Sequence, residues 1–139
     1  MNIAWVIPCR YAEVHDNLAT IVGAGIDTFW PGQLPSEVRV TVVVRLLATA
    51  DELGPGHEHT MRNVVRGPDG ETVGLPREAK FQAGTAEEVS SAREHWLNGI
   101  ELVTMAAFEA SEQGTYTFEL TVDDSTSSTP LHVFDGQSG

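Results

Sequence analysis

Two histidines separated by one residue are the most specific candidates for chemistry in this sequence. His57 and His59 flank Glu58, and residues i and i+2 of an extended strand point to the same face. Two imidazoles on one face of a strand are two of the ligands that a zinc or related metal site needs. The site of a cupin, a metal-binding β-sandwich that uses such a pair, also needs a carboxylate a few residues further along the same hairpin and another histidine later. Positions 63–65 here hold an asparagine and two valines.

His95 or His132 completes such a site only if the fold brings it close to the first pair. We therefore predict no bound metal and no other cofactor. His57 and His59 remain the metal candidates of an alternative function, a small-molecule or metal-binding β-sandwich.

The other residues that resemble catalytic groups have simpler structural explanations. Cys9 shares a strand face with Trp5 and Ile7, which predicts a buried thiol and not a nucleophile. Gly23-Ala24-Gly25 lacks the third glycine of a dinucleotide-binding loop, so close contact with a neighbouring segment explains it better. Asp123-Asp124 ends a strand and predicts a hairpin turn. Without a nucleophile elbow or a triad, we predict a protein that is not an enzyme.

Four arginines form the candidate interaction patch: Arg39, Arg45, Arg62 and Arg66. The alternation in segments 38–46 and 57–66 turns the apolar residues inward and these arginines outward. If the two segments are paired strands, half of the basic side chains gather on one sheet face. Two interpretations stay open: local pairing with carboxylates such as Glu58 or Glu71, or a basic patch that binds an acidic surface, including that of another copy.

Strict alternation of apolar and polar residues predicts the strands that must position these groups. It is clearest in segment 38–46, where valines and Leu46 share one face, and in segment 114–122, where Tyr116, Phe118, Leu120 and Val122 do. The opposite face of the second segment is a threonine row that can pack on another sheet. The Gly-x-Tyr start of that segment is typical of the penultimate strand of an immunoglobulin-like sandwich, in which the tyrosine hydroxyl bonds back to a corner.

The remaining pattern predicts a chain of short strands. Segment 3–14, with Pro8 at an edge or a bulge, and segment 18–30 form a hairpin around residues 15–17. Residues 31–35 break the sheet and cross between layers. Segments 57–66 and 71–73 form a second hairpin, and further strands follow at 77–83, 100–108 and 129–134. Between them, residues 84–99 are either a short helix, with a capping box at Thr85 and Glu88, or a loop.

Seven or eight such strands predict an all-β, immunoglobulin-like antiparallel sandwich. Four elements also match a known pattern: Tyr11-Ala12-Glu13, the segment 21–27, the Pro68-Asp69-Gly70 turn and Gly114-x-Tyr116. Together they resemble a family of small bacterial proteins catalogued only as a domain of unknown function. That resemblance implies a fold but no activity.

Composition limits the class of partner. The 139 residues and single cysteine fit one domain without disulfides, which we place at 1–134, with a flexible tail at 135–139. Eight basic against twenty acidic residues give a net charge of −12, which repels nucleic acid and anionic membrane. No segment resembles a signal peptide or a membrane span. We predict a cytoplasmic module that contacts a protein partner, including another copy of itself.

Overall fold

The computed structural model describes residues 1–84 and 97–136, and in these residues the protein is all-β. Chain order gives ten strands and one short 3-10 turn, η1 (Ala50–Glu52). The strands are β1 (Asn2–Cys9), β2 (Tyr11–His15), β3 (Leu18–Val22), β4 (Thr28–Phe29), β5 (Ser36–Ala48), β6 (His59–Arg66), β7 (Thr72–Phe81), β8 (Asn98–Ala110), β9 (Gly114–Val122) and β10 (Ser125–Val133).

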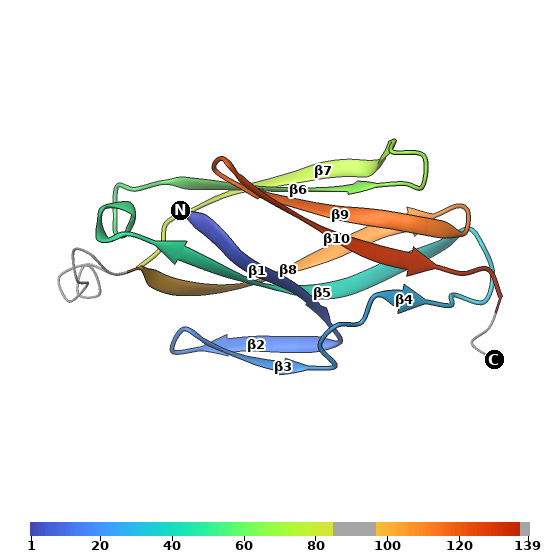
Figure 1. Ribbon diagram of the computed structural model, residues 1–139, viewed down its shortest axis with the longest axis horizontal. Coiled ribbons are helices and arrows are strands. Elements are labelled where there is room, and N and C mark those ends of the chain that lie inside the picture. Colours follow the sequence, from blue (N-terminus) through green and yellow to red (C-terminus); the bar gives the residue numbers. More distant parts are fainter. Residues whose placement is uncertain (85–96, 137–139) are drawn as a thin grey trace.

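Two sheets pack face to face around the main core (Figure 1). One has the order β1-β5-β8 and the other β4-β10-β9-β6-β7, and every pairing is antiparallel except that of β4 with β10. The all-β prediction is confirmed, and the immunoglobulin-like arrangement stays a prediction.

Strand β5 is the centre of the smaller sheet and supplies one wall of the core. Its even-numbered residues from Val38 to Ala48 are buried against the opposing sheet, as the alternation predicts. The facing wall comes from β9, where Tyr116, Phe118, Leu120 and Val122 are each at most 1% exposed. Each fully buried side chain of this size contributes about 1.5–3 kcal/mol to folding.

A hairpin of β2 and β3 lies below the three-stranded sheet as a small third layer (Figure 1). Asp16 and Asn17 form its two-residue turn with positive φ angles of 51° and 58°, the conformation that such turns require. Strand β2 contacts β5 and β8, and Val43, on the outer face of β5, is completely buried. The hairpin therefore covers part of the face that would otherwise meet water.

The segment 31–35 carries the chain from one sheet to the other, as predicted, because β4 belongs to the larger sheet and β5 to the smaller one. The predicted turns at 67–70 and 123–124 also join hairpins, β6 to β7 and β9 to β10. Pro8 lies on β1, an edge strand, again as predicted.

Three strand predictions are wrong in extent. Segment 3–14 is two strands because the chain leaves β5 after Cys9. Segment 18–30 ends at Val22, because Gly23 and Gly25 take positive φ angles of 67° and 83° that end the ladder. Segments 71–73 and 77–83 join into one strand, β7. Because segments 3–14 and 18–30 each hold two strands, the described residues contain ten strands and not seven or eight. The choice between a short helix and a loop in segment 84–99 falls mainly on residues 85–96, which lie outside the described residues.

In the described residues, no helix has the length and hydropathy needed to cross a bilayer.

The predicted tyrosine corner is present. The hydroxyl of Tyr116 donates to the carbonyl oxygen of Glu112 at 2.8 Å, four residues upstream, and the side chain is 1% exposed. Its ring packs against that of Phe108 on β8, with the ring centroids 4.9 Å apart. The hydrogen bond thus fixes the loop between β8 and β9 to the core.

Replacing Tyr116 with phenylalanine removes this hydrogen bond and leaves the ring in place. We expect the Tyr116→Phe variant to lose about 1 kcal/mol of unfolding free energy, measured in urea. Tyr11→Phe is the matched control, because Tyr11 is 54% exposed and its hydroxyl contacts only the exposed Glu13. Equal midpoints for the Tyr116→Phe protein and the parent would contradict a stabilising role for the corner.

Candidate functional site

One edge of the three-stranded sheet is open along part of strand β8. Strand β8 pairs with β5 over its whole length, from Asn98 opposite Ala48 to Ala110 opposite Ser36. No other strand among residues 1–84 and 97–136 pairs with its second edge. A strand edge presents unpaired N–H and C=O groups, so this one is a template for pairing with another chain.

The first part of that edge is capped by the turn of the β2–β3 hairpin. The amide nitrogen of Asn17 donates to the carbonyl oxygen of Gly99 at 2.5 Å, and its amide oxygen accepts from the backbone N–H of Glu101 at 2.9 Å. One side-chain amide thereby takes the place of a residue on a neighbouring strand. The two bonds also show that Gly99 and Glu101 direct their backbone groups away from β5.

An ion pair fixes the sheet surface at the same place. Arg45 and Glu101 are opposite each other on β5 and β8, and Nη1 of Arg45 lies 2.5 Å from Oε1 of Glu101. Glu101 is only 9% exposed. A Cβ at position 99 would lie 2.1 Å from Nη2 of Arg45, so a larger residue there would displace the guanidinium. The guanidinium therefore lies across Gly99, beside the hairpin turn.

The Asn17 cap can be removed without disturbing the turn. Glycine adopts the positive φ of position 17 freely, so Asn17→Gly deletes the two side-chain bonds and keeps the backbone conformation. We expect a loss of about 1–2 kcal/mol in urea unfolding and faster amide exchange at Glu101. Asp16→Gly, in the same turn, is the control. If Asn17→Gly left exchange at Glu101 unchanged, the cap would not be what protects this edge.

Beyond the cap, the edge of β8 is open. Because the β5–β8 register has no bulge, the alternation continues, and Val103, Met105 and Ala107 also direct their backbone groups away from β5. Val103 and Met105 are 42% and 39% exposed. The open stretch therefore combines free hydrogen-bonding groups with apolar side chains, which edge strands usually avoid.

The predicted arginine patch does not form on one sheet face. Arg39 and Arg45 lie on β5 of the three-stranded sheet, and Arg62 and Arg66 lie on β6 of the five-stranded sheet. The prediction failed because it paired 38–46 with 57–66, whereas the chain changes sheet between them.

Three of these arginines instead form ion pairs within the chain. Arg39 pairs with Glu37 at 2.7 Å, Arg45 with Glu101, and Arg66 with Glu119 at 3.0 Å. Local pairing with carboxylates, one of the two open interpretations, thus accounts for their placement. A role of the four residues in binding another molecule stays a prediction.

The two candidate metal ligands lie in different settings. His57 is exposed and precedes β6, whereas His59 is buried at the start of that strand. Nδ1 of His59 lies 2.8 Å from Oδ2 of Asp123, and Nε2 lies 2.7 Å from the carbonyl oxygen of Glu52. Both partners are acceptors, so both ring nitrogens donate and the imidazole carries a positive charge. In this arrangement His59 has no nitrogen left for a metal.

The ion pair of His59 with Asp123 changes the pKa values of both groups. Burial lowers the pKa of His59, but the hydrogen bonds to Glu52 and Asp123 and their charges outweigh burial and raise it above its ordinary value. Burial raises the pKa of Asp123, but the bonds from His59 and from the Thr60 N–H outweigh it and leave this pKa lowered. Asp123 also occupies the β9–β10 turn, with a positive φ of 53°.

Stability should follow the charge of this pair. Because the pKa of His59 is higher in the folded protein than in the unfolded chain, its charge stabilises the fold. This stabilisation is complete below the unfolded pKa of about 6.5, and it is lost as pH rises through the folded pKa. The pKa of Asp123 is lower in the folded protein than in the unfolded chain. Its stabilisation is therefore complete above the unfolded pKa of about 4, and it is lost as pH falls through the folded pKa. We therefore expect His59→Gln to cost more unfolding free energy at pH 5.5 than at pH 9.

The control is His57→Gln, which changes the exposed neighbour. Urea unfolding at the two pH values measures both variants against the parent. A loss for His59→Gln that is the same at pH 5.5 and pH 9 would show that His59 is not held as a cation.

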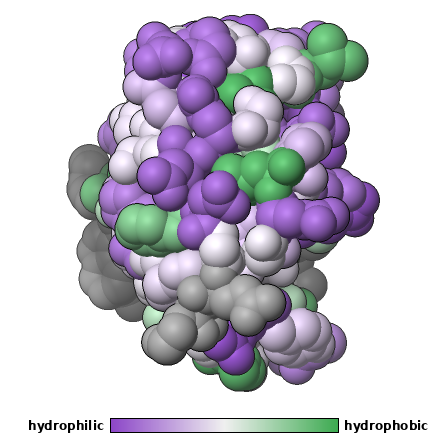
Figure 2. Space-filling view, turned by 90° about the vertical axis from the view of Figure 1, so that its right-hand side faces the viewer, coloured by the Kyte–Doolittle hydropathy of each residue, from purple (hydrophilic) through white to green (hydrophobic). Residues whose placement is uncertain are grey.

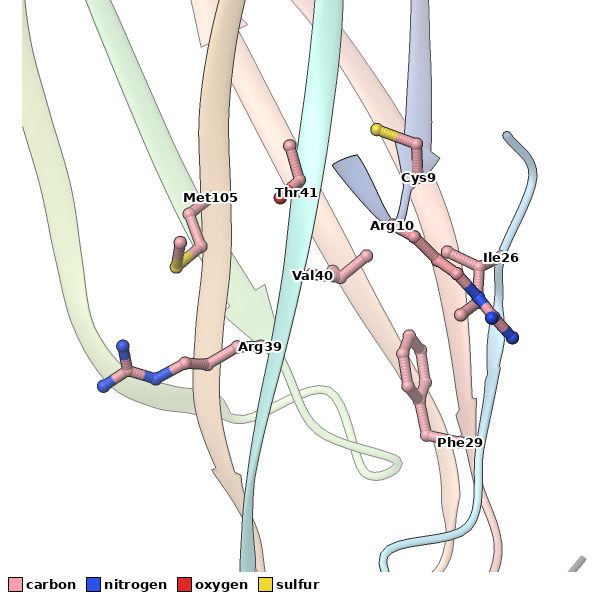
Figure 3. Close-up of a pocket in the computed structure, with 8 residues that line it drawn as sticks. All are labelled: Cys9, Arg10, Ile26, Phe29, Arg39, Val40, Thr41 and Met105. Atoms are coloured by element: carbon pink, nitrogen blue, oxygen red, sulfur yellow. The ribbon is translucent and has the colours of Figure 1, made fainter. Parts of the chain in front are cut away.

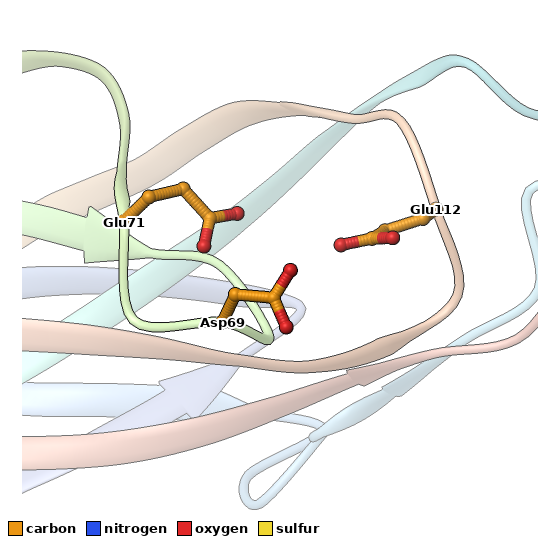
Figure 4. Close-up of side chains that lie close together, drawn as sticks. All are labelled: Asp69, Glu71 and Glu112. Carbon is orange, nitrogen blue, oxygen red and sulfur yellow. The ribbon is translucent and has the colours of Figure 1, made fainter.

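Three exposed carboxylates also meet at the opposite end of the molecule. Asp69 and Glu71 come from the turn between β6 and β7, and Glu112 comes from the loop before β9 (Figure 4). In the described residues, this is the one group of three or more histidine, cysteine, aspartate or glutamate side chains that lie close enough together to share a cation. It contains neither His57 nor His59. The surface at this end is largely hydrophilic, with only separate hydrophobic spots (Figure 2). Nothing further distinguishes it from an ordinary acidic surface.

Cys9 is buried, as predicted, with 1% of its surface exposed, and burial raises the pKa of its thiol. Of the glycines at 23 and 25, only Gly23 makes the predicted close contact, because nothing lies within 4 Å of a Cβ built at Gly25. A Cβ at Gly23 would lie 2.8 Å from Cγ of Arg10, so the close contact is with the stem of that arginine.

The open edge of β8 and its Asn17 cap do not follow from the predictions made from the sequence. One signal was available: in the alternation of segment 100–108, Val103 and Met105 take the outward positions. Two apolar residues on the outer face of a strand mark a surface that is covered or bound.

Comparison with protein families identifies the class of this protein. The model of the Family of unknown function (DUF6941) matches residues 4–134, so the chain belongs to that family. No curated protein and no solved structure matches the chain. The function of this family is unknown.

Proposed function

We propose that this protein is a non-enzymatic interaction module that self-associates through the open edge of strand β8. The observation that carries the proposal is the stretch from Val103 to Glu109, in which free backbone groups stand beside exposed apolar side chains. Strand addition at such an edge supplies affinity through backbone hydrogen bonds. Two copies of one edge satisfy each other around a two-fold axis.

The cap at Asn17 limits the register of this pairing. Because Gly99 and Glu101 are already bonded, a second copy has access only from residue 103 onward. Antiparallel pairing that uses the whole stretch 103–109 sets Met105 opposite Ala107 of the second copy, and Val103 opposite Glu109. A register centred on Met105 is less favourable for two reasons. It would place the like charges of Glu101 and Glu109 opposite each other, and the second copy would collide with the hairpin turn at Glu101.

In this register the two three-stranded sheets become one continuous sheet. Met105 and Ala107 lie beside the two-fold axis on its outer face, and Val103 lies at the end of the paired stretch. The interface then depends on backbone bonds and apolar contact, and not on the four arginines, so its affinity should change little with salt.

The alternative function, a ligand or metal site at His57 and His59, has less support because His59 already uses both ring nitrogens. A setting in the bacterial cytoplasm, with protein and not nucleic acid or membrane as partner, stays a prediction.

A proline at position 107 tests the interface. The N–H of Ala107 points away from β5, so Ala107→Pro removes a donor that only a second copy would use and leaves the β5–β8 ladder intact. We expect light scattering after size exclusion to show a dimer for the parent at tens of micromolar and a monomer for Ala107→Pro. Circular dichroism should be the same for both.

The control is Leu75→Ser, which removes the most exposed apolar side chain of the described residues, 91% exposed on β7. This variant should keep the mass of the parent. A parent protein that is monomeric at 100 µM would overturn the proposal, and so would an Ala107→Pro protein that remains a dimer.

A further inference from the structure

A second open edge lies where strand β1 leaves strand β5. Strand β1 pairs with β5 from Leu47 only as far as Thr41, opposite Cys9. The chain then turns away at Arg10, whose N–H donates to the carbonyl oxygen of Val22 in the hairpin. In the described residues, the part of β5 from Ser36 to Val40 has no strand on this side.

A cavity of about 340 Å³ occupies this position (Figure 3). Ile26, Phe29 and Val40 form its apolar wall, and Cys9 lies at the end of β1 above them. Such a volume is at the lower end of the range for ligand pockets. The cavity thus lies where β1 would continue if it stayed paired with β5. Its apolar wall would contact the next side chain that such an extended strand directs toward the core.

The backbone of β5 faces this cavity with free groups. Odd-numbered residues of β5 bond to β1, because the even-numbered ones bond to β8, and the unbroken register extends this alternation to Arg39 and Glu37. No backbone hydrogen bond of Arg39 or Glu37 occurs on this side among the described residues. An extended segment lying here could exchange hydrogen bonds with both residues.

The charge around the cavity is positive in a chain that is strongly acidic overall. Arg10 and Arg39 line its rim, and the lining contains no carboxylate. Arg39 is paired with the exposed Glu37, whereas Arg10 forms no ion pair with any described residue. The stem of Arg10 lies against Gly23.

We propose that this slot binds an extended peptide segment of a partner protein, which adds as a strand beside residues 36–40 of β5. Inward-facing apolar side chains of the peptide contact Phe29 and Val40, and outward-facing acidic side chains lie near Arg10 and Arg39. Backbone pairing supplies affinity, and the alternation of apolar and acidic residues supplies specificity. Met105 of the β8 edge also lines the cavity, so the two proposals are distinguished by Arg10 and by the backbone of β5, which only the peptide would contact.

A display library of random eight-residue peptides, selected on the full-length protein, tests this inference. We expect the enriched peptides to alternate apolar residues with aspartate or glutamate. Synthetic copies should bind at least tenfold more weakly to Arg10→Glu than to the parent. The matched control is Arg77→Glu, an exposed arginine on β7 that forms no ion pair with the described residues.

Amide hydrogen exchange shows whether the peptide adds as a strand. The bound peptide should slow exchange at Glu37 and Arg39 and leave Val38 and Val40 unchanged, because the latter two already bond to β8. Failure to enrich any peptide would overturn the proposal. Affinity that is equal for Arg10→Glu and the parent, or binding without slower exchange at Arg39, would overturn it as well.

Discussion

The pairing of backbone groups at strand edges is the constraint on which the rest of this structure depends. An open two-sheet fold has four edges, and each unpaired N–H or C=O group there needs water or a partner. The larger sheet ends in the two-residue strand β4 and in β7, which carries exposed charges. At the β1 edge, the N–H of Ile3 donates to Oγ of Ser125, so part of that edge is covered. The exceptions lie on β5 and β8.

One element, the hairpin of β2 and β3, accounts for both exceptions. Its formation takes the chain away from β5 after Cys9 and so leaves the edge at Ser36–Val40 open. Its turn then places Asn17 on β8, which closes the edge at Gly99 and Glu101 and leaves Val103 to Glu109 free. Strand β2 of the same hairpin also contacts β5 and β8, so the hairpin is packed against the three-stranded sheet. A change in its docking should therefore affect both open edges.

Features that depend on the local alternation of residues could be predicted from the sequence. Features that depend on which sheet each strand joins could not. The buried rows of β5 and β9, the turns at Asp16 and Asp123, and the Tyr116 corner follow from residue spacing and turn chemistry. The arginine patch failed because no local signal shows that β5 and β6 belong to different sheets. Likewise, Asp123, the carboxylate partner of His59, and Gly99, a partner of Asn17, lie 64 and 82 residues away along the chain, where spacing gives no information.

Amide exchange as a function of protein concentration tests the self-association of β8 most directly. If two copies pair through this edge, the amides of Val103, Met105 and Ala107 should exchange more slowly as the concentration rises from 1 to about 200 µM, across the range in which ordinary dimers form. The amide of Glu101, already bonded to Asn17, should not change. Exchange at all four positions that is independent of concentration, together with a constant monomeric mass, would contradict the account.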